Sequence, residues 1–191
     1  MRDFIPRLRG RLFTLKCRLI RRNINIGENL RIYKKLNIQV VGKLILGNNC
    51  RIQGIIGSPH KCVCIDAMSA DSEVRIGDNV TLCAARITAR FGITIGDNVL
   101  IEDASILDTD FHTLDKSRGT PLDESVQKCR IRIGNNVGIG AQSFITKGVE
   151  IGDGALIAPS AVVSRSVKPG HFAYGNPAIV VDKNKCGGNN T

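Results

Sequence analysis

The sequence has no tryptophan, and aromatic residues make up only 4% of its 191 residues. An apolar core must therefore be aliphatic, and isoleucine, valine and leucine are plentiful. No apolar run reaches the ~20 residues of a membrane-spanning helix. Arginines interrupt the basic N-terminus, so we expect no signal peptide there and a cytoplasmic location.

The sequence also lacks the residue spacing of a metal site. Its seven cysteines include no CxxC pair, and its three histidines, His60, His112 and His171, are far apart. Zinc ligands usually come in close pairs, so no metal is expected. Cys62 and Cys64 would point to one face of a strand. We interpret the cysteines as small, partly buried apolar residues in a reducing compartment.

The basic residues are concentrated at the N-terminus. The formal net charge is +10, and residues 2–22 carry eight basic residues and one acid, a net charge of +7. The rest of the chain therefore carries only +3 and is nearly balanced. Aromatic residues that stack on bases are scarce, which argues against nucleic-acid binding.

The N-terminal segment 1–23 has a helical pattern. Its apolar residues recur at intervals of three and four, with arginines on the other faces, and are Ile5, Leu8, Leu12, Leu15 and Leu19. We favour packing of this apolar stripe against the domain or a neighbouring subunit. A second interpretation is peripheral contact of residues 1–22 with an anionic surface at the inner face of the membrane.

A repeat of six residues determines the expected fold. Aliphatic residues recur every six positions without a slip at Ile133, Ile139, Ile145, Ile151, Ile157 and Val163. Related fragments begin at Ile26, Leu46, Ile76 and Ile95. A period of six fits short strands joined by corners, with three such units closing one triangular coil. The aliphatic residue points inward, and Gly, Asn and Asp occupy the corners.

The repeat extends over residues 24–181, which we interpret as one all-β domain. Residues 54–72 follow the period loosely and are interpreted as degenerate coils. The repeat lapses over residues 108–129, a polar stretch that contains Asp108, Asp110 and His112. A long loop inside a regular solenoid is usually functional. Residues 182–191 are expected to form a flexible tail.

Several motifs follow one another in order: Ile95-Gly-Asp-Asn-Val-Leu-Ile101, Asp110-Phe-His112, Ile133-Gly-Asn-Asn-Val-Gly-Ile-Gly-Ala141, Gly148-Val-Glu-Ile-Gly-Asp153, Ile157-Ala-Pro-Ser160 and Gly175-Asn-Pro-Ala178. Their order and spacing resemble the hexapeptide-repeat acyltransferases, especially the branch of galactoside, maltose and polysaccharide O-acetyltransferases. The resemblance covers residues 74–181 and, as repeats only, residues 24–73. It implies a left-handed parallel β-helix, a homotrimer with active sites between subunits, and acetyl-CoA as co-substrate.

The resemblance assigns the catalytic base to His112, which takes the proton of an acceptor hydroxyl as that hydroxyl attacks a thioester. Asp110, or alternatively Asp108, is the expected partner that orients the imidazole. Ala141 and Ala158 match small residues whose backbone contacts the pantetheine arm of coenzyme A.

Further matches concern the nucleotide end of coenzyme A. Ser164 and Arg165 match a Thr-Lys pair near the adenine and the phosphates. A second basic residue usually follows the Asn-Pro-Ala motif, but Ile179 stands there, and Lys168 is our candidate for a compensating contact, with Lys147 and Lys183 as alternatives. The asparagine that helps the site in sugar acetyltransferases is replaced by Leu82.

These matches predict a coenzyme A-dependent O-acetyltransferase that modifies a hydroxyl of a sugar in a surface polysaccharide or its lipid-linked precursor. One alternative is another acceptor, such as serine, an antibiotic or an amino sugar. Another is a non-enzymatic β-helix scaffold, which would need neither the polar loop nor His112. A zinc hydratase of the carbonic anhydrase type needs three histidines with a close pair, and this chain lacks such a pair.

Overall fold

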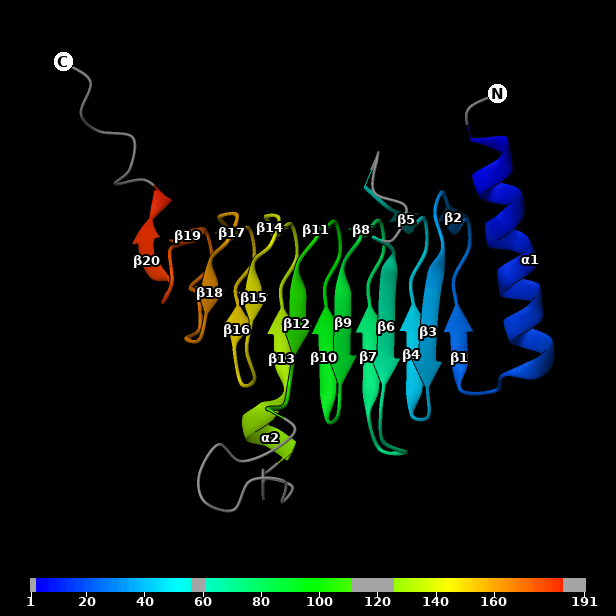
Figure 1. Cartoon of the computed structure of the whole chain (residues 1–191), viewed down its shortest axis with the longest axis horizontal. Helices are drawn as coiled ribbons and strands as arrows, with labels where there is room; N and C mark the ends of the chain where they lie inside the picture. Colours follow the sequence, from blue (N-terminus) through cyan, green and yellow to red (C-terminus); the bar gives the residue numbers. More distant parts are fainter. Residues whose placement is uncertain (1–2, 56–60, 111–125, 184–191) are drawn as a thin grey trace.

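A computed structural model describes residues 3–55, 61–110 and 126–183 of the chain. A long helix, α1 (Phe4–Ile20), is followed by an elongated left-handed parallel β-helix (Figure 1). Three sheets form the faces of this β-helix, named here faces A, B and C. Each complete coil contributes one strand to each face in that order, which confirms the triangular coil expected from the period of six.

The three faces are built as follows. Face A contains β1 (Ile24–Ile26), β4 (Lys43–Leu46), β7 (Glu73–Ile76), β10 (Gly92–Ile95), β13 (Ile131–Ile133) and β16 (Glu150–Ile151). Face B contains β2 (Arg31–Ile32), β5 (Arg51–Gln53), β8 (Thr81–Cys83), β11 (Leu100–Glu102), β14 (Gly138–Ile139), β17 (Leu156–Ile157), β19 (His171–Tyr174) and β20 (Ile179–Asp182). Face C contains β3 (Leu36–Val40), β6 (Val63–Ala67), β9 (Arg86–Ala89), β12 (Ser105–Leu107), β15 (Phe144–Ile145) and β18 (Val162–Val163). β20 pairs antiparallel with β19 and ends the β-helix.

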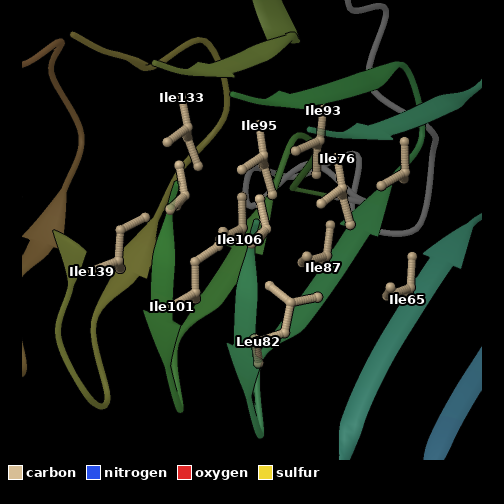
Figure 2. Close-up of a cluster of buried hydrophobic side chains, with 14 of the residues drawn as sticks. Ile65, Ile76, Leu82, Ile87, Ile93, Ile95, Ile101, Ile106, Ile133 and Ile139 are labelled. Carbon is tan, nitrogen blue, oxygen red and sulfur yellow. The ribbon is translucent and has the colours of Figure 1, made fainter. Parts of the chain in front are cut away.

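The core consists of aliphatic columns inside the β-helix (Figure 2). Inward residues of successive coils stand opposite one another, as in the pairs Ile101–Ile139 and Ile106–Ile145. The aliphatic residues of the six-residue period between positions 133 and 163 are each at most 3% exposed. Burial of each such side chain stabilises the fold by about 1.5–3 kcal/mol, so these columns take the place of an aromatic core.

The corner between faces A and B repeats one backbone conformation. A left-handed φ of 56° to 58° occurs there at Asn29, Asn49, Asn79, Asn98 and Asn136. Asparagine tolerates this conformation better than most side chains. The preceding side chains form a ladder, because each accepts a hydrogen bond of 2.7–2.8 Å from a backbone N–H one coil earlier: Asn48, Asp78, Asp97, Asn135 and Asp153.

Helix α1 packs on the first coil, but through the face opposite to the apolar stripe that was expected to pack there. Pro6, Gly10 and Cys17 are buried, and a Cβ on Gly10 would overlap the carbonyl oxygen of Leu30. The apolar residues at positions 5, 8, 12, 15 and 19 are instead 46–76% exposed. The prediction that this stripe packs on its own domain is therefore wrong, because a small-residue face lets the helix backbone approach the coil closely. Packing against a neighbouring subunit stays a prediction.

The structure also bears on two expectations about the less regular parts of the chain. β6 lies between β3 and β9 in face C, so the described part of the loosely repeating stretch 54–72 belongs to the coil. Asp182 is part of β20 rather than of a tail, and residues 184–191 lie outside the described residues. In the described part of the chain, no helix is long and apolar enough to cross a membrane.

Candidate active site

The β-helix is interrupted at the corner between faces C and A. One coil earlier, residues 90 and 91 suffice to join β9 to β10, whereas residues 108–130 separate β12 from β13. The helical turn α2 (Val126–Cys129) lies at the C-terminal end of this insertion, just before β13 (Figure 1). The excursion loop thus occurs where the lapse of the repeat predicted it. His112 lies outside the described residues, as does His60.

Asp108 anchors the start of the excursion loop. It follows β12 directly and is fully buried. Its Oδ1 accepts a hydrogen bond of 2.7 Å from the backbone N–H of Arg90. Its Oδ2 accepts bonds of 2.9 Å and 2.6 Å from the backbone N–H groups of Phe91 and Gly92. Hydrogen bonds to an ionised acceptor are about twice as strong as neutral ones, so Asp108 fixes the loop to the preceding corner.

Asp110 has a different environment. Its side chain is 51% exposed, and Oδ2 lies 2.7 Å from Nζ of Lys147. Lys147 belongs to the same corner one coil later, between β15 and β16. The backbone N–H of Gly148, the next residue, donates a 2.9 Å bond to the carbonyl oxygen of Cys129. Both ends of the excursion loop are therefore tied to this corner.

The residues expected to bind coenzyme A occupy two corners of the last coils. Ala141 and Ala158 lie in successive coils at the corner between faces B and C, where the backbone N–H of Ser160 donates to the carbonyl oxygen of Ala141 at 2.8 Å. Ser164 and Arg165 follow β18 at the corner between faces C and A. The structure therefore separates the alanines from the polar pair by the length of one strand of face C.

The corner between faces C and A is rich in cations near the loop. Ser164, Arg165 and Lys168 are all exposed. Arg165 stands one coil beyond Lys147 at this corner. Lys168 follows Val167, which bridges to Ile151 of face A, so Lys168 lies at the corner between faces A and B. Ile179, which stands in place of the family's second basic residue, is 58% exposed at the start of β20. Nζ of Lys183 donates instead to the carbonyl oxygen of Gly154 at 2.5 Å, so that cation is committed elsewhere.

A groove on face C was not anticipated from the sequence. Three depressions, of about 660, 200 and 220 Å³, meet at Arg86 on β9. The largest lies between α1 and β3, and another reaches Leu107, the residue before Asp108. Asp66 lines the groove beside Arg86, and its Oδ2 accepts a 3.4 Å bond from the hydroxyl of Thr88. In the sequence, the alternation of inward Ile65 with outward Cys64 and Asp66 was the signal that could have indicated this groove.

The described residues offer no metal site. No group of three His, Cys, Asp or Glu side chains within residues 3–55, 61–110 and 126–183 is arranged to hold an ion. Sγ of Cys62 lies 3.9 Å from Sγ of Cys64, and Cys17, Cys50, Cys62, Cys64 and Cys83 are free thiols. Burial raises the pKa of the Cys50 thiol to about 11, which makes it a packing residue rather than a nucleophile.

Comparison with known proteins agrees with this architecture. The family model "Bacterial transferase hexapeptide (six repeats)" matches residues 130–165, and "Hexapeptide repeat of succinyl-transferase" matches residues 73–103. A predicted acetyltransferase of Saccharomyces cerevisiae is 32% identical over 152 residues, which cover 76% of this chain and 69% of the yeast protein. The chain belongs to the hexapeptide-repeat acyltransferase family. Galactoside O-acetyltransferase of Escherichia coli is 34% identical over 97 residues, 48% of this chain.

Solved structures of the hexapeptide-repeat family share the fold. AntD, an N-acyltransferase from Bacillus cereus in complex with dTDP and 3-hydroxybutyryl-CoA, matches with a TM-score of 0.64 at 19% identity, over 90% of both chains. Galactoside acetyltransferase in complex with coenzyme A matches with a TM-score of 0.54 at 21% identity, over 92% of this chain and 79% of that one. The alignment spans less than half the length of some curated relatives, including 44% of galactoside O-acetyltransferase.

Proposed function

We propose that this chain is an acyltransferase that moves an acetyl group from acetyl-CoA to a hydroxyl of a sugar. The observation that carries the proposal is the long insertion between β12 and β13, which starts at Asp108 and is joined to the next coil by the ion pair of Asp110 with Lys147. A structural solenoid gains nothing from such an insertion, whereas a transferase needs polar side chains at a coenzyme site. Family membership and the naming of E. coli galactoside O-acetyltransferase support the same class and a sugar acceptor.

In this proposal the acetyl-CoA lies across face C of the last coils. The backbone at Ala141 and Ala158 approaches the pantetheine arm, because small side chains leave room for it. Ser164 and Arg165 at the next corner bind the phosphates and the adenine, together with Lys168, which lies beyond the face A residue Val167. We assign the acceptor to the groove that runs past Arg86 toward the excursion loop.

The proposed reaction is a direct transfer. His112 takes the proton of the acceptor hydroxyl, the hydroxyl oxygen forms the new C–O bond, and the thioester C–S bond breaks. The same imidazolium then protonates the leaving thiolate of coenzyme A, so protons balance. Asp110 and Asp108 are the candidates for orienting His112, and their environments make Asp108 the more rigid of the two.

The finer parts of the proposal concern assembly and acceptor. We propose a homotrimer, with a sugar of a surface polysaccharide or its lipid-linked precursor as acceptor, and a cytoplasmic location that includes peripheral contact with the inner face of the membrane. An acceptor screen separates the alternatives. Transfer to the amine of an amino sugar gives an amide that is stable in mild base, whereas transfer to a hydroxyl gives an ester that mild base cleaves. Serine or an antibiotic hydroxyl also gives an ester, so these acceptors are told from a sugar by which compound supports thiol release.

The testing experiment is acetyl-CoA titration calorimetry with the wild type and His112→Ala, followed by assay of free thiol release with candidate acceptors. We expect both proteins to bind acetyl-CoA and His112→Ala to lose turnover by about 100-fold or more. His171→Ala is the matched control, because His171 bonds to the backbone oxygen of Pro169 at the last coil, and it should keep turnover. If neither the wild type nor His112→Ala binds acetyl-CoA, the non-enzymatic scaffold alternative is favoured.

A further inference from the structure

Helix α1 has three distinct faces along its length. The buried face of Pro6, Gly10 and Cys17 packs on the first coil. The opposite face of α1, which lies at the N-terminal end of the β-helix (Figure 1), is an exposed apolar ridge. Its side chains are 46–76% exposed and are Phe4, Ile5, Leu8, Leu12, Leu15 and Leu19. Because the packed face is separate, the ridge contributes nothing to closing the coil.

Cations flank this ridge on both sides. At 100° per residue, Arg7, Arg11 and Arg18 lie along one edge, and Arg9 and Lys16 lie along the other. α1 contains no acidic residue. The neighbouring Asp3 is engaged by the body, since its Oδ1 accepts a 2.8 Å bond from the hydroxyl of Tyr33 and its Oδ2 lies 3.7 Å from Nη1 of Arg31.

We propose that α1 docks this protein on the surface of an anionic lipid bilayer. The apolar ridge enters the boundary between headgroups and acyl chains, and the two cationic edges contact lipid phosphates. Charge complementarity favours this occupant over a second copy of the chain, because two ridges in contact would bring like-charged edges together. The proposal rests on the peripheral membrane contact named in the proposed function and assigns that contact to one face of α1. It does not depend on the transferase activity, so the tests below can fail while the proposed acyl transfer stands.

The absence of tryptophan allows a direct test on the full chain. Leu12→Trp, at a ridge position that is 58% exposed, creates a single fluorescent reporter. Leu100→Trp, on β11 and 43% exposed, is the matched control away from α1. We expect the emission of Leu12→Trp to shift to the blue with vesicles of phosphatidylcholine and phosphatidylglycerol, and that of Leu100→Trp to stay unchanged. A concentration-dependent blue shift without vesicles would instead show contact between copies and overturn the proposal.

Vesicle flotation of charge variants tests the cationic edge. Replacing Arg7, Arg11 and Arg18 by glutamine should lower binding to the anionic vesicles by about 10-fold or more. The reason is that the affinity for an anionic surface falls roughly tenfold for every one to two basic residues lost near it. The matched control replaces Lys43, Arg75 and Arg132, three face A cations that pair with Glu73 or Glu150, and should keep binding. Equal binding of all three proteins, or equal loss in both variants, would overturn the proposal.

Discussion

Asp108 and Asp110 lie two residues apart, yet burial gives them different roles. Asp108 is fully buried and accepts three backbone hydrogen bonds from residues 90–92. Asp110 is half exposed and pairs with Lys147 across water-accessible surface. Desolvated, multiply bonded carboxylates stabilise a fold far more than exposed ion pairs do.

This difference predicts unequal effects on stability. Asp108→Ala leaves three backbone donors without their acceptor, and we expect it to lower the free energy of unfolding by about 2–3 kcal/mol. Asp110→Ala removes only an exposed ion pair and should cost about 1 kcal/mol or less. Urea unfolding followed by circular dichroism measures both. Equal losses in the two variants would contradict the anchoring role of Asp108.

The corner ladder predicts a pH dependence at Asp78. The backbone N–H and side-chain amide of Asn48 donate to its carboxylate and hold the pKa of Asp78 below its ordinary value of 3.8. A lowered folded-state pKa stabilises the fold above the unfolded value, and this stabilisation is lost as the pH falls through the folded value. We therefore expect the difference in Tm between the wild type and Asp78→Asn to be largest near neutral pH and to shrink in acid.

Asn135→Ala is the matched control for this pH effect. Asn135 occupies an equivalent position in the ladder and accepts a 2.8 Å bond from the backbone N–H of Asp97, but it carries no charge. Its loss should lower Tm by a similar amount at neutral and acidic pH. A pH-independent difference for Asp78→Asn as well would show that its ionisation does not contribute.

At the scale of elements, the outward residues of the three faces differ. Face A carries paired charges such as Lys43 with Glu73 and Arg132 with Glu150, which suit a solvated surface. Face C carries the groove that passes Asp66 and Arg86 and reaches the end of β12 at Leu107. The faces share one inward pattern, so the different outward chemistry of face C is what supports the proposal that this face binds the acceptor.

The groove predicts a selective kinetic defect. We expect Arg86→Gln to raise the KM for the sugar acceptor by about 10-fold, because a hydrogen bond to a charged group contributes about 1.5–3 kcal/mol. The affinity for acetyl-CoA, measured by calorimetry, should stay unchanged. Arg75→Gln on face A is the matched control and should alter neither quantity. An acetyl-CoA affinity that falls with Arg86→Gln would show that the groove holds the coenzyme instead.

At the scale of the whole molecule, the candidate coenzyme residues lie on successive corners of one convex prism, so one chain alone offers them no enclosing wall. A second subunit against face C would supply that wall, in keeping with the proposed trimer. We expect light scattering of the full chain to give about three times its mass of 20.7 kDa. A mass equal to one chain would require the site to be completed within a single subunit.

The sequence by itself determined the β-helix, its inward columns and the position of the excursion loop. The reason is that local geometry sets the period of six, because each coil repeats the same strand and corner. The aliphatic residues at this period from Ile133 to Val163 can therefore be predicted to be buried from their spacing alone. The resemblance added the candidates at His112, Ala141 and Arg165, but their roles depend on a partner molecule and stay predictions.

Only the tertiary structure decided which face of α1 packs, what Asp108 binds and where the groove lies. Each depends on groups distant in sequence that no local pattern encodes. Gly10 packs because the carbonyl oxygen of Leu30 lies against it, and Asp108 is fixed by N–H groups sixteen to eighteen residues earlier. The leucines of α1 had the stronger pattern for burial, but close approach of backbone to backbone required the smaller residues.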